Sequence, residues 1–173
     1  MHEIEEILIS RDTLTAKVKE LGEAISKDYK GMELVLIGVL KGSFIFMADL
    51  IREITIPVDV DFISISSYGE STISSGIVKI IKDIDINITK KHVLIIEDIV
   101  DTGLTLNYLK ELFMTRNPKS VKICSALDKV DRRKVKIDID YEGFSIPDKF
   151  VVGYGLDYAG KYRNLPDICV LKP

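Results

Sequence analysis

The sequence predicts an α/β protein in which a central, mainly parallel sheet is flanked by helices. Three runs, residues 34–40, 93–96 and 121–127, are mostly apolar and contain many β-branched residues. Such runs are typical of strands that helices cover on both sides. A segment with the helical spacing of apolar residues follows each of the first two runs. This alternation of strand and helix favours parallel pairing.

The chain has the length and composition of one globular domain. It contains 173 residues, of which 46% are hydrophobic and 29% charged, and we expect a single domain over residues 1–173. A net charge of −3 argues against a dedicated nucleic-acid binder, which normally carries a basic face. The acidic first ten residues do not resemble a secretion signal, and no apolar stretch approaches membrane-spanning length. We therefore expect a cytoplasmic protein without a membrane or nucleic-acid partner.

The first predicted element is a short strand at residues 4–9, which a helix follows. Ser10 offers an N-cap and Asp12 an acid in the first turn. Gly31 can end this helix. Its apolar residues fall on one face: Leu14, Val18, Leu21 and Ile25.

The second unit begins with the buried run at 34–40. A glycine turn at 41–43 leads from it into an apolar helix that extends from Phe44 to about Ile54. After Pro57, residues 58–66 partly alternate between polar and apolar, as expected of a strand with one exposed side.

A polar, glycine-bounded stretch at 67–76 predicts a long mobile loop, and loops of this length in compact domains are often lids. A strand resumes at 76–83. Beyond the run at 93–96, a helix is predicted that ends near Arg116 and whose apolar face contains Leu106, Leu109, Leu112 and Phe113.

The last third of the chain predicts strands. The buried run at 121–127 ends at Asp128 and Lys129, and late strands are expected at 134–144, 150–158 and 168–171. Cys124 and Cys169 are widely separated, and each lies in an apolar run, which predicts buried free thiols.

The stretch after the central run contains the residues with the clearest chemistry. Glu97 and Asp98 are adjacent acids at the end of a predicted strand, and Asp101 begins an Asp-Thr-Gly-Leu-Thr turn. Adjacent carboxylates repel each other unless a cation or hydroxyl donors compensate them. Ligands of open α/β sheets bind beyond the strand ends, and a helix N-terminus attracts anions. The stretch therefore predicts a sugar-phosphate site, although an acidic loop or another nucleotide-binding fold is the alternative from these acids alone.

This stretch resembles the ribose-phosphate signature of the type I phosphoribosyltransferases, which bind 5-phosphoribosyl 1-diphosphate. Three more stretches, residues 40–43 (LKGS), 66–69 (SSYG) and 148–157 (DKFVVGYGLD), resemble the hypoxanthine-guanine branch of that family. The resemblance implies a small hood built from the termini and late strands. It also implies a purine-salvage enzyme that makes IMP and GMP, uses Mg²⁺ and forms a homodimer or homotetramer.

The resemblance assigns the sugar-binding residues. It implies that Glu97 and Asp98 contact the ribose hydroxyls directly or through Mg²⁺, and that Asp101 is the general acid/base for the imidazole proton of the purine. The 5-phosphate would be held by Thr102, Gly103, Leu104 and Thr105. Plain helix capping at these last residues is compatible with that role, because a capping geometry is also an anion site.

The resemblance also assigns residues for the pyrophosphate and the base. Leu40, Lys41, Gly42 and Arg163 would hold the pyrophosphate, and the Leu40–Lys41 peptide is cis in some members. Asp157 would lie near the pyrophosphate as a Mg²⁺ ligand and contribute to the base site. The lid would include Ser67, Tyr68 and Gly69.

Lys129 would donate to the six-oxo group of the purine, Phe150 would stack on the base, and the Val151 backbone would hydrogen-bond to it. From the residues alone, a solvated Lys129 in the charged run 128–136, core positions for Phe150 and Val151, and an exposed Arg163 are the alternatives.

Two other functions remain open from the sequence. One is a regulator with the same fold that binds nucleotide and RNA, against which the acidic composition argues. The other is an enzyme that prefers another base, such as xanthine. No Walker A motif or GxGxxG fingerprint competes with the nucleotide prediction.

Overall fold

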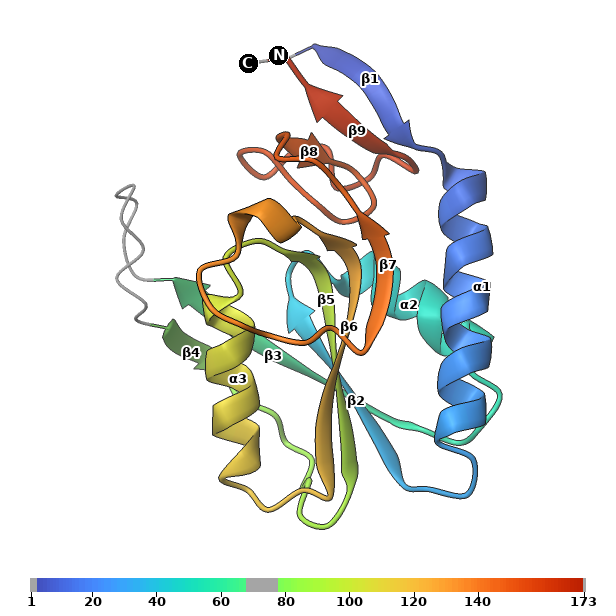
Figure 1. The fold of residues 1–173 in the computed structure, drawn as a ribbon, viewed down its shortest axis with the longest axis vertical. Helices are drawn as coiled ribbons and strands as arrows, with labels where there is room; N and C mark the ends of the chain where they lie inside the picture. Colours follow the sequence, from blue (N-terminus) through green and yellow to red (C-terminus); the bar gives the residue numbers. More distant parts are fainter. Residues whose placement is uncertain (1–2, 68–77, 173) are drawn as a thin grey trace.

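The computed structural model describes residues 3–67 and 78–172, apart from the Ser67 side chain. Its main sheet has the strand order β4-β3-β2-β5-β6-β7 (Figure 1), and only the β3–β4 pairing is antiparallel. This confirms the predicted α/β class. The strands are β2 (Leu34–Leu40), β3 (Asp59–Ser67), β4 (Val78–Lys82), β5 (His92–Val100), β6 (Ser120–Asp128) and β7 (Tyr141–Ser145).

Helices cover both faces of this sheet (Figure 1). The helices α1 (Arg11–Asp28) and α2 (Phe44–Glu53) pack in one core cluster that includes Leu36 and Leu94, whereas α3 (Leu104–Met114) packs in a second cluster that includes Ile37 and Ile95. Successive residues of a strand point to opposite faces. The central strands must therefore be apolar on both faces, as their sequences are.

The predicted start of α1 is confirmed. The Ser10 hydroxyl accepts a hydrogen bond from the backbone N–H of Thr13 at 3.2 Å, which satisfies one of the free donors of the first turn. The helix ends at Asp28, so Gly31, which has a φ of +77°, lies in the turn beyond it rather than at its end. The predicted apolar face is buried: Leu14, Val18, Leu21 and Ile25.

A second, antiparallel sheet forms the predicted hood. It consists of β1 (Ile4–Ile9), β9 (Ile168–Leu171) and β8 (Val151–Val152), in the order β1-β9-β8. This sheet lies beyond the carboxyl ends of the main parallel strands and brings the two ends of the chain together (Figure 1). Its position places residues near 150 above the predicted sugar site.

The late strands are shorter than predicted. Residues 134–140 form no strand, and β7 begins only at Tyr141. Within 150–158 only β8 is a strand, because the chain then turns through Gly153, Tyr154 and Gly155, all with positive φ. Backbone turning therefore shortens the strand that was predicted at 150–158.

The predicted loop at 67–76 mostly lies outside the described residues, as do Tyr68 and Gly69 of the predicted lid. Ser67 is the last residue of β3, and the described part of the predicted strand at 76–83 forms β4. Cys124 and Cys169 are buried free thiols, as expected.

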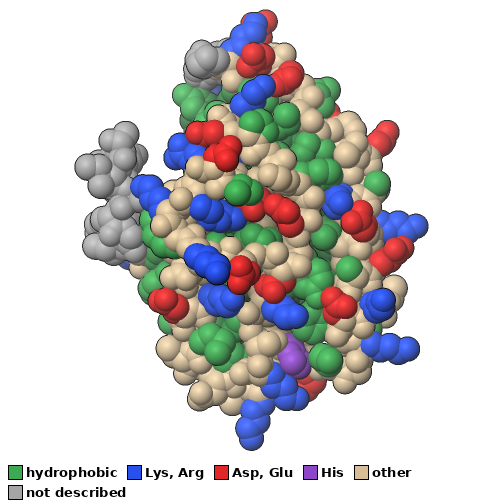
Figure 2. Space-filling model, in the orientation of Figure 1, with side chains coloured by type: hydrophobic (Ala, Val, Ile, Leu, Met, Phe, Trp, Pro, Cys, Tyr) green, Lys and Arg blue, Asp and Glu red, His purple; other side chains and the backbone are tan. Residues whose placement is uncertain are grey.

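The face of the molecule in Figure 2 mixes Lys and Arg with Asp and Glu, without a large area of one sign. Among the described residues, no helix has the length and apolar character that crossing a membrane requires.

Candidate active site

The acids Glu97 and Asp98 lie inside β5 rather than at its end. This strand continues to Val100, and Glu97 is in register with Ser125 of β6. The prediction that the strand ends at these acids is therefore wrong, because parallel pairing with β6 extends the strand past the apolar run. Glu97 is only 7% exposed. Its burial, and then the adjacent Asp98, raise the pKa of Glu97 well above the ordinary value.

Gly42 brings the turn after β2 against this acidic pair. A Cβ built on Gly42 would lie 1.7 Å from Oδ2 of Asp98, so a side chain there cannot coexist with the present Asp98 carboxylate. The Leu40–Lys41 peptide bond is cis. Ser43 is fully buried, and its hydroxyl donates to the carbonyl oxygen of Val39 at 2.7 Å. The residues predicted to bind pyrophosphate and ribose are thus in direct contact.

The turn between β5 and α3 encloses a hollow of about 170 Å³, whose lining residues lie between Glu97 and Leu106 but do not include Leu104. Gly103 precedes α3 with a φ of +82°, a conformation that favours glycine. The Thr102 hydroxyl accepts from the backbone N–H of Leu104 at 3.4 Å. Thr105 lies in the first helical turn and lines the hollow. Free amides and hydroxyls at a helix N-terminus suit a phosphate group.

Asp101 stands at the rim of this hollow and is held by two arginines that the sequence patterns did not single out. Nε of Arg132 donates to Oδ1 of Asp101 at 2.7 Å, and Nη1 of Arg133 donates to the Asp101 carbonyl oxygen at 3.1 Å. Both arginines belong to the charged run 128–136. From the sequence, this run was considered only as a solvated segment that could contain Lys129. The charges of this run, DKVDRRKVK, gave no signal of which arginine would face Asp101.

Lys129 is buried, with 9% exposure, so the solvated alternative is wrong. Its backbone N–H donates to the carbonyl oxygen of Val100 at 2.9 Å, which places it beside the end of β5. Its ammonium lies 3.6 Å from Oδ1 of Asp148. The ammonium therefore stands at the same sheet edge as Asp101.

Phe150 is 53% exposed, so a core position for it is also wrong. Its ring meets that of Tyr158 edge to face, with 5.5 Å between the ring centroids. Phe150 and Tyr158 line an apolar hollow of about 400 Å³ at the hood. Val151 is buried in the core, where its side chain contributes packing and leaves only its backbone for a ligand.

Asp157 and Arg163 face each other. Nη2 of Arg163 lies 2.9 Å from Oδ1 of Asp157, and Nη1 donates to the carbonyl oxygen of Gly155 at 2.6 Å. The Arg163 side chain is 26% exposed, so it is not a free surface residue. A Cβ on Gly155 would lie 2.2 Å from the carbonyl oxygen of Gly42, so this turn packs on the predicted pyrophosphate loop.

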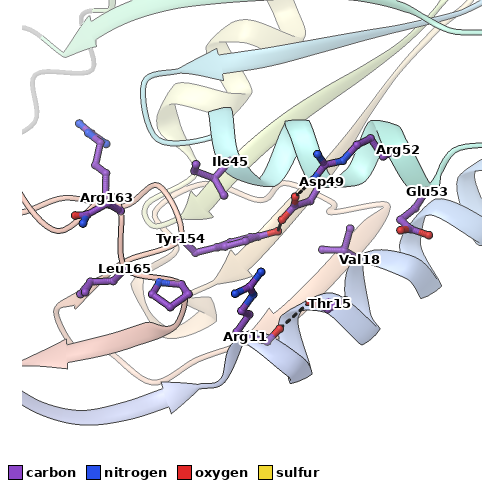
Figure 3. Close-up of a pocket in the computed structure, with 12 residues that line it drawn as sticks. Arg11, Thr15, Val18, Ile45, Asp49, Arg52, Glu53, Tyr154, Arg163 and Leu165 are labelled. Carbon is purple, nitrogen blue, oxygen red and sulfur yellow. Dashed lines mark hydrogen bonds and ion pairs between the residues drawn. The ribbon is translucent and has the colours of Figure 1, made fainter.

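A cavity of about 510 Å³, whose lining includes Arg163, lies between α1, α2 and the segment near Leu165. Figure 3 shows the residues that line it. The Tyr154 hydroxyl donates to Asp49 at 2.6 Å inside it, whereas the Arg163 side chain extends away from both residues. None of the acids of β5 lines this cavity, so it is not the predicted sugar site.

The acidic pair has the chemistry of a partial Mg²⁺ site. Hard oxygen ligands suit this ion, which proteins often hold through one or two carboxylates together with substrate phosphates. Across residues 3–67 and 78–172, no group of three or more His, Cys, Asp or Glu could hold a metal ion by itself. Asp157 thus does not join Glu97 and Asp98 in a three-carboxylate site. A Mg²⁺ ion held by these carboxylates would need further oxygen ligands from the substrate.

Comparison with known proteins agrees with the phosphoribosyltransferase resemblance of the sequence motifs. Residues 9–159 match the family model described as phosphoribosyl transferase domain. The hypoxanthine-guanine phosphoribosyltransferase of Bacillus subtilis is 56% identical over 172 residues, which cover 99% of this chain and 96% of that protein. The hypoxanthine phosphoribosyltransferase of Salmonella typhimurium is 51% identical, over 93% of this chain and 92% of the relative.

Solved structures agree with the fold. A hypoxanthine-guanine phosphoribosyltransferase from Bacillus anthracis, with a HEPES molecule in the active site, superposes with a TM-score of 0.95 at 55% identity. The match covers 98% of this chain and all of that chain. A hypoxanthine phosphoribosyltransferase from Staphylococcus aureus gives a TM-score of 0.96 at 49% identity, over 98% and 92% of the two chains.

The matched domain and the named relatives define a transferase, and the chain belongs to the phosphoribosyltransferase family. Within that family, its relatives place it in the hypoxanthine-guanine branch, as the sequence motifs predicted.

Proposed function

We propose that this enzyme transfers the 5-phosphoribosyl group from 5-phosphoribosyl 1-diphosphate to hypoxanthine or guanine in purine salvage. A purine ring nitrogen attacks the anomeric carbon, the bond to pyrophosphate breaks, and IMP or GMP forms. The contact between the ends of β5 and β6 supports this proposed reaction most directly. The backbone N–H of Lys129 donates to the carbonyl oxygen of Val100 at 2.9 Å, and this bond joins the sugar and base residues at one sheet edge. Such an edge is where open α/β sheets bind their ligands.

The sugar would lie over the turn between β5 and α3. Its 5-phosphate would occupy the hollow that Thr102, Gly103 and Thr105 line, with Leu104 in the same turn, and the amides and hydroxyls of this turn would be the donors. Its hydroxyls would meet Glu97 and Asp98. The repulsion between the two acids is relieved either by protonation of Glu97, which its burial favours, or by a bound cation or hydroxyl donors.

The proposed cofactor is Mg²⁺, which neutralises charge on the leaving pyrophosphate when bound. Glu97 and Asp98 would hold it with substrate oxygens, and Asp157 would act from the pyrophosphate side. Lys41, Gly42, the Leu40 backbone and Arg163 would surround the pyrophosphate. The contact of Gly42 with Asp98 supports this arrangement, since it leaves no side chain between the loop and the acids.

Lys129 and Phe150 would bind the purine base and distinguish it from other bases. The ammonium of Lys129 would donate to the six-oxo group of hypoxanthine or guanine, whereas adenine presents an amino donor at that position. The half-exposed Phe150 ring offers a face for stacking, and the Val151 backbone would complete the contact. Asp101 would receive the imidazole proton as the ring nitrogen attacks.

We also propose that residues 1–173 act as one domain in a cytoplasmic homodimer or homotetramer, with Ser67, Tyr68 and Gly69 in a lid. Lid closure would exclude water from the reactive sugar.

Steady-state rates with hypoxanthine, guanine, xanthine and adenine, each with the sugar diphosphate and Mg²⁺, test the proposal. We expect hypoxanthine and guanine to release pyrophosphate at comparable rates and adenine at the background rate. A preference for xanthine would reject the proposed substrates. Absence of turnover with every base, together with a nucleic-acid mobility shift, would instead favour a regulator.

A further inference from the structure

Arg132 joins two carboxylates that belong to different parts of the site. Nε donates to Oδ1 of Asp101 at 2.7 Å, and Nη1 donates to Oδ2 of Asp148 at 3.4 Å. The other oxygen of Asp148 lies 3.6 Å from the ammonium of Lys129. Negative and positive side chains therefore alternate from Asp101, the proposed proton acceptor, through Arg132 and Asp148 to Lys129, the proposed hydrogen-bond donor to the base.

We propose that Arg132 is a positioning residue that orients the Asp101 carboxylate for proton transfer. The proposal rests on the role proposed above for Asp101. In this role Arg132 acts through the side chain of Asp101 and not through a contact of its own with the substrate.

The geometry leaves one oxygen of Asp101 available. Oδ1 is used by Arg132, whereas Oδ2 makes no hydrogen bond within the residues that the structure describes. A carboxylate held through one oxygen keeps a defined direction for the other, which can then accept the proton of the purine. Small errors in the placement of a catalytic group are costly, because proton transfer requires hydrogen-bond distance and alignment.

The backbone of Asp101 is fixed independently of its side chain. Nη1 of Arg133 donates to the Asp101 carbonyl oxygen at 3.1 Å, and Nη2 of Arg133 pairs with Oδ1 of the buried Asp128 at 2.5 Å. The N–H of Lys134 donates to the Thr102 carbonyl oxygen at 2.9 Å. Loss of Arg132 alone would therefore free the Asp101 side chain while its main chain stays in place.

A purely structural role for Arg132 is a poor explanation for the contact. The side chains of Arg132 and Asp101 are 45% and 46% exposed, and ion pairs with this much exposure add little to folding stability. The pair joins residues 31 apart in sequence at the proposed reacting centre. Its principal effect should thus fall on the reaction.

The central test is a double-mutant cycle with Arg132→Ala and Asp101→Asn. We expect Arg132→Ala to lower kcat with hypoxanthine by about tenfold or more, with the KM of the sugar diphosphate within about threefold of wild type. In the Asp101→Asn background, Arg132→Ala should change kcat by less than about twofold, because the group it orients is gone. Arg132→Lys should recover part of the rate, since a point charge lacks the fork geometry.

The matched control is Arg116→Ala. Arg116 makes an exposed, two-bond pair with Asp83 at 3.0 and 2.6 Å, away from all residues of the site, so its loss should leave kcat unchanged. Equal losses of kcat from Arg132→Ala in the wild-type and Asp101→Asn backgrounds would overturn the proposal, as would wild-type kcat in Arg132→Ala.

A crystal structure of Arg132→Ala provides a test that does not depend on activity. We expect the Asp101 carboxylate in more than one rotamer, with the backbone at Asp101 unchanged. A single, unaltered rotamer would reject the positioning role even if the proposed reaction were wrong. Conversely, unchanged kcat in Asp101→Asn alone would reject the acid/base role without bearing on the rotamers.

Discussion

Gly42 and Asp98 are in such close contact that only a glycine can stand beside the carboxylate in its present position. A methyl group on Gly42 would lie 1.7 Å from Oδ2 of Asp98. The turn after β2 and the acidic pair within β5 therefore form one surface, although Gly42 and Asp98 are 56 residues apart in the sequence.

Gly42→Ala should displace Asp98 or the turn itself and so lower kcat/KM for the sugar diphosphate about 10²-fold, since displacements near 1 Å have effects of that size. Steady-state kinetics measures this effect. Gly31→Ala is the control: Gly31 has a positive φ, and a Cβ added to it would meet no atom within 4 Å, so it should cost stability without a change in kcat/KM. Wild-type kinetics in Gly42→Ala would show that the contact is dispensable.

Lys129→Met should remove the charge while it keeps the apolar stem. We expect kcat/KM for hypoxanthine to fall by about 10- to 100-fold, the usual range for one lost hydrogen bond to a charged group, and the discrimination against adenine to weaken. Both bases should be measured with the same preparation.

The control for Lys129 is Lys91→Met, which removes an ion pair with Asp59 at 3.2 Å from the opposite end of β5 and should leave both bases unaffected. If Lys129→Met excluded adenine as strongly as the wild type does, the proposed reading of the six-oxo group would be wrong.

Phe150→Ala should weaken binding of the base without unfolding the protein, because the ring is 53% exposed. Loss of an aromatic contact predicts a rise of roughly 3- to 10-fold in the KM of hypoxanthine, with little change in Tm. Met114→Ala, which truncates a side chain of α3 with 50% exposure, should change neither value. An unchanged KM in Phe150→Ala would argue that the base stacks elsewhere.

Glu97→Gln should stabilise the protein relative to wild type as pH rises, when metal is removed with a chelator. Burial, and then Asp98, raise the pKa of Glu97 in the folded protein above its unfolded value. The folded state then binds the proton more tightly, so the favourable contribution of Glu97 is complete below the unfolded pKa and is lost as pH rises through the folded pKa. Glutamine does not titrate.

The Tm of Glu97→Gln minus that of the wild type should therefore increase from about pH 4 to neutral pH, and thermal denaturation across that range measures it. A difference in Tm that stayed constant over this range would contradict a raised pKa. The same Glu97→Gln enzyme should need more Mg²⁺ for half-maximal activity.

Much of the fold was predictable because its determinants are local in sequence. Residues 34–40 form β2 with the predicted bounds, and the Ser10 cap and the α2 helix were also correctly predicted. The strand expected at 134–144 was wrong over its first seven residues. There the chain packs across the turn before α3, where side chains of Val135 and Ile137 would lie 3.3 and 3.1 Å from a Cβ on Gly103. The apolar side chains of Val135 and Ile137 therefore pack against another loop instead of lying in a paired strand.

By itself, the sequence determined the class of the protein and the location of its sugar-phosphate motif. Apolar character on both faces of a strand and the order Glu-Asp followed by Asp-Thr-Gly are properties of neighbouring residues. Only the tertiary structure decided that Arg132 holds Asp101, that Gly42 contacts Asp98 and that Lys129 is buried. These relationships join segments distant in the chain, and charged residues look alike in sequence until folding determines which partner each one meets.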